Sequence, residues 1–280
     1  MSEKYVDGDL PPLRQVIEEY GLYAEKSLGQ NFLLDLNLTR KIIKLSPALT
    51  NLHVIEIGPG PGGLTRSILE GEPGFLTVYE IDQRAIHALQ GIKALYSDHL
   101  EIVYADALSI NWPDVMKEGQ NYAFIANLPY NIATPLTVSF LKALSEHPEQ
   151  IAFMTLMFQK EVARRLTAKP GSKDYGRLSV LAQSLCETRI LFDIPPNAFV
   201  PQPKVTSSVV VFKPVKMYHN TVPVSAIEKV TSKAFGKRRK MIRSSLEDYV
   251  AYFELLGLSG NERAEDIPVQ TYIQLAEMHE

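Results

Sequence analysis

The sequence has little cysteine and no long apolar run, and both shortages limit what the protein can be. Cys186 is the single cysteine among 280 residues, which excludes an intrachain disulfide framework and a zinc site built from cysteines alone. No stretch reaches the roughly 18 consecutive apolar residues that a membrane-spanning helix requires. The first 25 residues contain six acidic side chains and no apolar block, unlike a signal or transit peptide. We therefore expect a soluble, cytoplasmic protein that does not contact a membrane.

An excess of charge of one sign is also missing, but the charges are distributed unevenly. The 29 basic and 32 acidic residues leave a formal charge of −3, which argues against a strongly basic, tail-driven nucleic-acid binder. By segment, residues 1–195 carry 18 − 23 = −5, residues 196–243 carry 10 − 1 = +9, and residues 244–280 carry 1 − 8 = −7. Within the middle segment, a basic island is formed by Lys233, Lys237, Arg238, Arg239, Lys240 and Arg243. The basic island predicts binding of a polyanion, unless it is a solvated helix face that pairs with the acidic end of the chain.

The first two thirds of the chain alternate between short apolar runs typical of strands and segments with helical spacing. Asp35 is placed as the N-cap of a helix that lasts until Pro47, and a second helix is expected at 160–166. The expected strands are residues 53–57, 75–79, 100–104, 122–126 and 151–157. This alternation predicts a parallel sheet with right-handed crossovers, whose ligands bind at the carboxyl ends of the strands.

The last third has a different character. Residues 189–194 and 207–212 predict an antiparallel strand pair at a sheet edge, and they bracket a loop with four prolines. From about Val224 onward the spacing of apolar residues is helical only. Roughly 60 residues are marginal for an independent core, so we expect these helices to pack against the sheet. The expected division is a sheet domain at 1–214 and a small helical domain at 215–280.

A glycine loop follows the first expected strand. The G-x-G-x-x-G spacing is met by Gly58, Gly60 and Gly63. Glu80 follows 80 − 58 = 22 positions later, where an acid can hold ribose hydroxyls. The two prolines inside the loop have no N–H for phosphate oxygens, which argues against a pyrophosphate cradle. The pattern predicts an adenosine cofactor, and alone it leaves open a nicotinamide-dependent oxidoreductase or a loop that serves tight backbone geometry only.

A second motif, Asn127-Leu128-Pro129-Tyr130, follows the fourth expected strand. The exocyclic amine of adenine is a poor nucleophile because its lone pair is delocalised into the ring. If the Asn127 side-chain oxygen and a backbone carbonyl near Leu128 accept its two N–H groups, they favour a pyramidal nitrogen that can attack. Tyr130 would stack on the flipped base. The competing interpretation is an Asn-Leu-Pro turn that only leads into the next helix.

Longer motifs resemble the ribosomal RNA adenine N6-dimethyltransferases, most of all the bacterial type that acts on small-subunit (16S) rRNA. They are KSLGQNFL at 26–33, EIGPG at 56–60, NLPYNI at 127–132, YGRLS at 175–179 and PPNAFVPQPKV at 195–205. The likeness extends from about Tyr23 to the C-terminus. It implies an α/β, class I S-adenosylmethionine-dependent methyltransferase fold, Rossmann-like, with a mostly parallel sheet, an antiparallel edge and a small all-helical C-terminal domain that binds RNA.

The resemblance also implies roles for individual residues. Matched position by position, the cofactor-binding residues are Asn31, Leu33, Gly58, Glu80, Asp106 and Asn127. Gly58 approaches the methionine part, Glu80 holds the ribose and Asp106 binds the adenine amine of S-adenosylmethionine. Asn127 lies between cofactor and target, and Phe199 stacks on the target base opposite Tyr130. RNA contacts are expected from Lys237, Arg238, Arg239 and Lys240.

The implied reaction is dimethylation of two adjacent adenines near the 3′ end of 16S rRNA in an immature 30S subunit, carried out by a monomer. Direct transfer requires no metal, because the leaving group is an uncharged thioether and catalysis rests on positioning. Three alternatives remain: a related methylase of large-subunit rRNA, the nicotinamide-dependent oxidoreductase, and a ribosome-assembly checkpoint that binds the immature subunit. The +9 segment and the Phe199 loop favour the small-subunit type.

Overall fold

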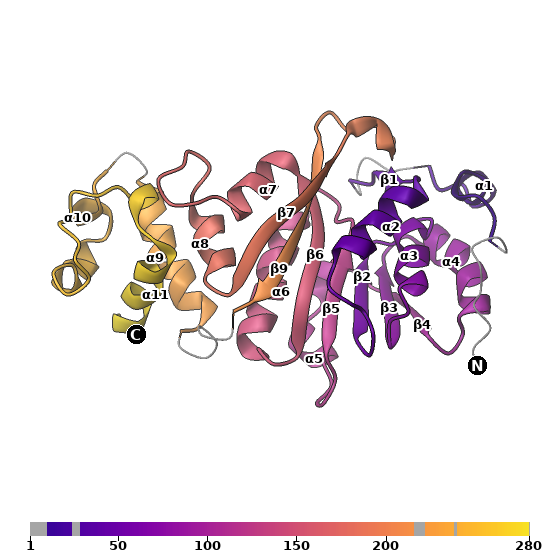
Figure 1. Cartoon of the computed structure of the whole chain (residues 1–280), viewed down its shortest axis with the longest axis horizontal. Helices are drawn as coiled ribbons and strands as arrows, with labels where there is room; N and C mark the ends of the chain where they lie inside the picture. Colours follow the sequence, from indigo (N-terminus) through magenta and orange to yellow (C-terminus); the bar gives the residue numbers. More distant parts are fainter. Residues whose placement is uncertain (1–9, 24–28, 216–221, 238–239, 280) are drawn as a thin grey trace.

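The centre of the molecule is a seven-stranded sheet in a computed structural model that describes residues 10–23, 29–215, 222–237 and 240–279 (Figure 1). In sheet order the strands are β4 (Leu100–Tyr104), β3 (Phe75–Glu80), β2 (His53–Ile57), β5 (Tyr122–Ala126), β6 (Ile151–Gln159), β9 (Ser207–Pro214) and β7 (Cys186–Ile194). The first five are parallel, and β9 runs antiparallel to both of its neighbours. The predicted mostly parallel sheet with an antiparallel edge is confirmed.

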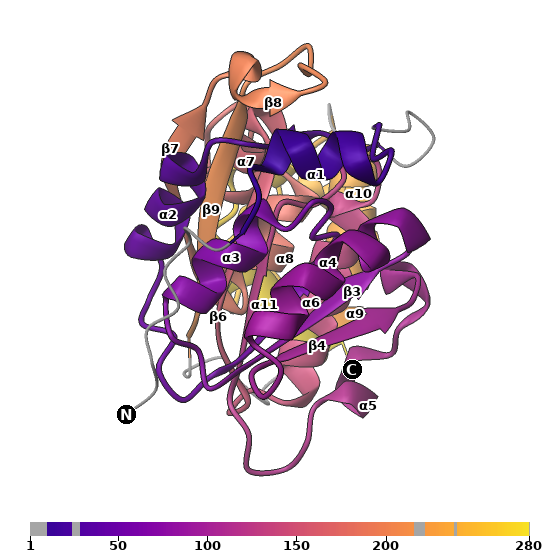
Figure 2. The same ribbon diagram turned by 90° about the vertical axis from the view of Figure 1, so that its right-hand side faces the viewer.

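Helices cover both faces of this sheet (Figure 2). They are α1 (Leu13–Glu19), α2 (Leu36–Leu45), α3 (Gly63–Glu70), α4 (Gln83–Leu95), α5 (Trp112–Val115), α6 (Ala133–Glu146), α7 (Lys160–Leu166) and α8 (Arg177–Gln183). Apolar side chains of α2, α3 and α4 pack with one face of the strands, and those of α5 and α6 pack with the other. All five residues of β5 are buried, as a strand covered on both faces requires.

Acidic side chains begin several of the helical segments. The Asp35 carboxylate accepts a hydrogen bond from the backbone N–H of Asn37 (2.9 Å) and caps α2, as predicted. Asp82 caps α4 in the same way, through the N–H of Arg84 (3.0 Å). Asp106 caps a short 3₁₀ turn, η3 (Ala107–Ser109). Two of these caps, Asp82 and Asp106, come within two residues of strand ends, so the chain enters each helical segment close to the carboxyl edge of the sheet.

Strand ends differ from the sequence-based prediction, and one small sheet was not predicted. β6 continues to Gln159 and β7 begins at Cys186, because these parts of both strands pair with β9. The small sheet joins β1 (Phe32–Leu33) and β8 (Phe199–Val200), with Leu33 opposite Phe199. Strands of two residues carry no periodicity, so only tertiary contact reveals them.

The described elements that follow β9 are helical: α9 (Val224–Gly236), α10 (Ile242–Ser245), the 3₁₀ turns η6 (Glu247–Tyr252) and η7 (Ala264–Asp266), and α11 (Val269–Met278). One apolar cluster runs from α6 and α8 into α9 and α11, so these helices pack against the sheet domain as expected. The hydroxyl of Tyr175 also donates a hydrogen bond (2.9 Å) to the carbonyl of Ile267, which links the sheet domain to the C-terminal helices. The domain boundary at residue 214 stays a prediction. No helix in the described ranges is long and apolar enough to cross a membrane.

Candidate active site

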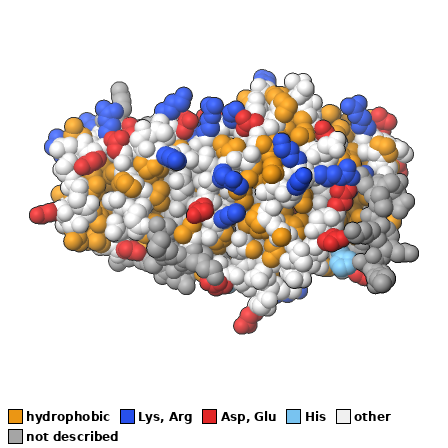
Figure 3. Space-filling view, viewed as in Figure 1, with side chains coloured by type: hydrophobic (Ala, Val, Ile, Leu, Met, Phe, Trp, Pro, Cys, Tyr) orange, Lys and Arg blue, Asp and Glu red, His pale blue; other side chains and the backbone are white. Residues whose placement is uncertain are grey.

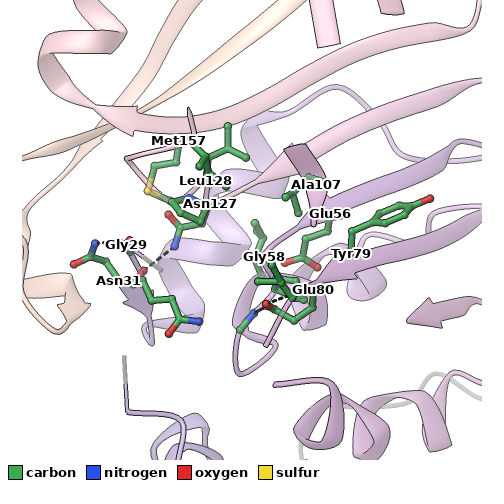
Figure 4. A pocket seen from close by; sticks show the side chains of 18 of the residues that line it. Gly29, Asn31, Glu56, Gly58, Tyr79, Glu80, Ala107, Asn127, Leu128 and Met157 are labelled. Carbon is green, nitrogen blue, oxygen red and sulfur yellow. Dashed lines mark hydrogen bonds between the residues drawn. The ribbon is translucent and has the colours of Figure 1, made fainter. Parts of the chain in front are cut away.

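A pocket of about 220 Å³ lies at the carboxyl ends of the parallel strands (Figure 4). It brings together seven of the residues singled out in the sequence, namely Asn31, Leu33, Gly58, Glu80, Asp106, Asn127 and Tyr130. They come from segments up to 130 − 31 = 99 positions apart. Their convergence is what the rule for open parallel sheets predicts.

The glycine loop between β2 and α3 forms the floor of the pocket. Gly58, Gly60 and Gly62 have φ values of +62°, +54° and +87°, which side chains other than hydrogen rarely permit. A Cβ added to Gly60 would lie 2.7 Å from the Phe32 ring. The Gly58 N–H donates to the carbonyl of Tyr79 (2.9 Å) and holds the loop against β3. The glycines therefore serve backbone geometry and also leave space in the pocket.

Glu80, the last residue of β3, ties this loop to the strand end. Its Oε1 accepts the backbone N–H groups of Ile81 (2.8 Å) and Asp82 (2.9 Å), and its Oε2 accepts that of Gly60 (3.2 Å). Burial raises the pKa of the Glu80 carboxyl, and the three N–H donors counteract this. The carboxylate is thus held in place with acceptor capacity remaining for hydroxyl groups.

Asp106 follows β4 and lies at the exposed rim of the pocket. Its Oδ1 accepts the N–H of Leu108 (2.9 Å) as the cap of η3. The cap occupies one carboxylate oxygen, so the second suits an amine donor. Its contact with the adenine amine of the cofactor stays a prediction.

The amide of Asn127 has a defined orientation. Its Nδ2 donates to the backbone carbonyl of Asn31 (3.0 Å), and the Asn31 side chain in turn donates to the carbonyl of Gly29 (3.2 Å) (Figure 4). Because Nδ2 is used within the protein, Oδ1 is the atom left to accept a hydrogen bond from a substrate. An acceptor at this place is what the predicted activation of an adenine amine needs.

Tyr130 is anchored at its hydroxyl. The Tyr130 hydroxyl and the Ser207 hydroxyl on β9 lie 2.5 Å apart and share a hydrogen bond. Burial raises the pKa of Tyr130, so the phenol stays neutral. Ser207 is fully buried and was missed from the sequence, because a bond between residues 77 positions apart leaves no local signal. The anchored ring can offer its face to a base.

Phe199 lies outside the group of residues that line the pocket. It sits on β8 opposite Leu33, and only 2 % of its surface is exposed. Its ring packs in the apolar cluster that includes Leu33 and Val209. The ring has to leave this packing to contact a base, and its stacking role stays a prediction.

The basic island lies at and beyond the end of α9. Lys237 and Lys240 are exposed, and within the described ranges neither forms an ion pair. Arg238 and Arg239 lie outside the described residues. Lys233 pairs with Asp248 and lies 5.7 Å from the ring centre of Tyr249. Pairing with the acidic end of the chain therefore holds for Lys233, and among the described residues it is not seen for Lys237 or Lys240.

Glu56 is a residue of the pocket wall that sequence reasoning did not single out. It lies on β2, its side chain is 1 % exposed, and burial raises its pKa to about 8. The available signal was an acid within an otherwise apolar strand, two residues before the glycine loop.

Among the described residues, no group of three or more His, Cys, Asp or Glu side chains is placed to hold a metal ion.

Comparison with known proteins shows which family the chain belongs to. The family model described as ribosomal RNA adenine dimethylase matches residues 21–280, which is nearly the whole chain. The chain belongs to the ribosomal RNA adenine dimethylase family. It is an S-adenosylmethionine-dependent methyltransferase, and the pocket fits this cofactor: Glu80 offers acceptors for hydroxyls, Asp106 an acceptor for an amine, and the glycine loop leaves room for close approach.

Curated relatives match the chain over nearly its full length. The chain is 48% identical over 273 residues to ribosomal RNA small subunit methyltransferase A of Chelativorans sp. (strain BNC1), covering 97% of this chain and 98% of the relative. The protein of the same name from Bradyrhizobium diazoefficiens is 47% identical over 276 residues, covering 96% and 95%.

Two solved structures share the fold. A dimethyladenosine transferase from Plasmodium falciparum has a TM-score of 0.70 at 22% identity, covering 86% of this chain and 94% of that one. The 23S rRNA methyltransferase ErmE has a TM-score of 0.66 at 24% identity, covering 88% and 98%. At such identities the likeness concerns the fold alone.

Proposed function

We propose that this protein dimethylates N6 of two adjacent adenines near the 3′ end of small-subunit rRNA, within an immature small ribosomal subunit. The choice of subunit is supported by relatives named small subunit methyltransferase A, which are 47% and 48% identical over nearly the whole chain. The 23S rRNA methyltransferase ErmE is 24% identical, and at that identity the likeness supports the fold and not a large-subunit target. The oxidoreductase alternative explains neither the Asn127 turn nor the family match.

The orientation of Asn127 is the observation that carries the chemistry. When bound, the cofactor supplies a methyl group on a sulfonium sulfur, and the protein has to present the amine to it. Asn127 Oδ1, with a backbone carbonyl near Leu128, accepts the two N–H groups of the target amine and favours a pyramidal nitrogen. Tyr130, held by Ser207, fixes the plane of the base. These contacts position the amine, and positioning is the main contribution the protein makes.

The distribution of exposed cations supports a structured RNA as substrate. Figure 3 shows Lys and Arg side chains spread over the upper half of one face, from the C-terminal helices across to the sheet domain, with some Asp and Glu side chains among them. Exposed cations on and after α7 include Arg164, Arg165 and Lys169. Lys237 and Lys240 at and after the end of α9 are exposed as well, and exposed cations of this kind are suited to phosphate groups.

The test is to incubate the protein with labelled S-adenosylmethionine and undermethylated small or large ribosomal subunits, and to map the methylated adenines. We expect two adjacent dimethylated adenines near the 3′ end of the small-subunit rRNA and none in the large subunit. Label confined to the large subunit would contradict the proposal. If the protein binds immature small subunits and transfers no methyl group, the assembly-checkpoint alternative takes its place.

A further inference from the structure

One acidic side chain of the pocket, Glu56, faces no cation among the described residues that line the pocket. Glu56 Oε2 is fully buried and accepts no hydrogen bond from any described residue. The hydroxyl of Thr65 on α3 is a polar neighbour that favours the charged form, but it lies outside hydrogen-bond geometry. A buried carboxylate is costly unless it is paired. Glu56 is therefore either protonated or opposite a cation.

The surroundings of Glu56 supply no cation from the pocket wall. The described residues that line the pocket include three acids, Glu56, Glu80 and Asp106, and no Lys, Arg or His. Glu80 on β3 raises the pKa of Glu56 by repulsion. On α3, Arg66 donates to the carbonyl of Pro11 (2.8 Å). A pocket lined in this way is complementary to a ligand that brings its own positive charge.

The three acids differ in how the protein compensates them. Glu80 accepts three backbone N–H groups and Asp106 accepts one, whereas Oε2 of Glu56 accepts none. Figure 4 shows Glu56 on the same side of the pocket as Gly58 and Glu80. Oε2 of Glu56 is thus a buried carboxylate oxygen of this wall that no backbone N–H of the described residues compensates.

We propose that Glu56 senses the charge of the cofactor: its carboxyl is protonated in the free protein and releases the proton to solvent when S-adenosylmethionine occupies the pocket. After methyl transfer the sulfur is a neutral thioether, and Glu56 takes a proton back from solvent. The pocket then favours S-adenosylmethionine over S-adenosylhomocysteine and aids exchange of the spent cofactor. This inference rests on the cofactor use of the proposed function and not on the RNA target.

The raised pKa of the Glu56 carboxyl supports the proposal. Burial raises the pKa of Glu56 to about 8, so the free protein holds this proton at neutral pH. A cation close to the carboxylate lowers the pKa again. Cofactor binding and proton release are then linked, in the same way that any shifted group links ligand affinity to pH.

Calorimetry of cofactor binding tests the proposal without RNA. Titrations of S-adenosylmethionine and S-adenosylhomocysteine into wild-type protein and Glu56→Gln, in two buffers of different ionisation enthalpy at pH 7, give both the affinities and the protons released. We expect wild type to release more protons with S-adenosylmethionine than the variant does. We expect the preference for S-adenosylmethionine over S-adenosylhomocysteine to fall by about tenfold in the variant, the effect of losing one close charge pair. The ligands' own ionisation is the same for both proteins and cancels.

Controls separate this role from a structural one. Glutamine has the shape and neutrality of the protonated carboxyl, so the variant should fold, which a thermal melt checks. Glu118→Gln, at an exposed position, removes one charge elsewhere and should leave preference and proton release unchanged. A Glu56→Gln protein with the wild-type preference and proton count overturns the proposal. Wild-type protein that binds neither ligand would instead contradict the use of this cofactor.

A second measurement does not depend on the variant. In wild type, the preference for S-adenosylmethionine should rise between pH 6 and pH 8, by up to about tenfold per unit, and level off above. Both affinities are corrected for titration of the free ligands. A preference that is constant over this range also overturns the proposal.

Discussion

The side chain of Asn127 has one polar atom bound to the protein and one left for the substrate. The bond from Nδ2 to the Asn31 carbonyl sets the amide plane before any RNA arrives. Preorganised acceptors of this kind contribute to catalysis because they require no rearrangement in the transition state.

Asn127→Ala should remove methyl transfer while cofactor affinity stays within a few fold of wild type. We expect the single-turnover rate to fall by about 10²- to 10³-fold, as for loss of one preorganised polar group in an active site. Single-turnover methylation and calorimetry of cofactor binding measure the two effects. Asn131→Ala, an exposed neighbour that also lines the pocket, is the matched control. Near-normal turnover in Asn127→Ala would show that its amide does not act on the amine.

Glu56 makes the stability of the cofactor-free protein depend on pH. Its pKa is raised in the folded protein, from 4.5 to about 8, so the folded state binds the proton more tightly than the unfolded state. Stability is therefore highest below about pH 4.5 for this group and is lost as pH rises towards 8. Relative to Glu56→Gln, wild type should lose about 3 kcal/mol between pH 5 and pH 8. Urea denaturation of both proteins across this range measures the difference, and parallel pH profiles would refute it.

Sequence reasoning located the site residues that close a strand and missed those defined by tertiary contact. Gly58, Glu80 and Asp106 were found because parallel strand ends converge at one edge. Glu56 and Ser207 were missed, since burial of one carboxyl and a hydroxyl pair between distant strands depend on packing that no local pattern contains. Phe199 came only from family likeness, and its buried position explains why no pattern placed it in the pocket.

At the scale of elements, strand centres were predictable and strand ends were not. β2, β4 and β5 match their predicted ranges because each is a short apolar run that ends at residues typical of turns or caps. β6, β7 and β9 are longer than predicted, because antiparallel pairing extends into residues that are not apolar. The short α8, which ends just before β7, was not predicted, although α7 has the same length and was. In α8 the four consecutive residues 179–182 are buried, so the alternation of an amphipathic helix is missing.

The left-handed backbone of the glycine loop can be tested by substitution of Gly60. Gly60→Ala places a Cβ 2.7 Å from the Phe32 ring at a φ of +54°. We expect a loss of about 1–3 kcal/mol in the free energy of unfolding, because the loop has to shift. Cofactor affinity should fall at least tenfold, since the shifted loop also moves the acceptor set at Glu80. Denaturant melts and calorimetry measure both.

The matched control for this substitution is Gly91→Ala. Gly91 lies within α4, and a Cβ added there meets no atom within 4 Å. Its replacement should stabilise the protein by roughly 0.5–1 kcal/mol through helix propensity and leave cofactor affinity unchanged. If the two variants behave alike, the left-handed loop conformation is not what the pocket depends on.

At the scale of the whole molecule, charges of opposite sign lie in different places, although the net charge is close to zero. The net charge of −3 is the sum of −5 for residues 1–195, +9 for residues 196–243 and −7 for residues 244–280. The charged side chains among the described residues that line the pocket are all acids, and the upper half of the face in Figure 3 carries many Lys and Arg side chains. Separating the two avoids attraction of phosphate groups into the cofactor pocket.

Neutralising Lys237, Arg238, Arg239 and Lys240 together should weaken RNA binding and flatten its salt dependence. Each lost phosphate contact reduces the slope of log affinity against log salt by about 0.7–0.9. Binding to undermethylated small subunits across a salt series measures this. Replacement of the exposed Lys44 and Lys117 by alanine should leave the slope unchanged. An unaltered slope in the fourfold variant would assign the basic island to a solvated helix face.

The two-residue ladder between β1 and β8 sets the order in which the pocket is completed. Its partners Phe32 and Val200 are 200 − 32 = 168 positions apart, so closing this contact carries a high entropy cost for very few hydrogen bonds. We expect the wall that holds Asn31 and Leu33 to form after the main sheet and to open first. Amide hydrogen exchange should then be faster at Phe32 and Val200 than in β5, so that the entrance can open while the scaffold stays folded.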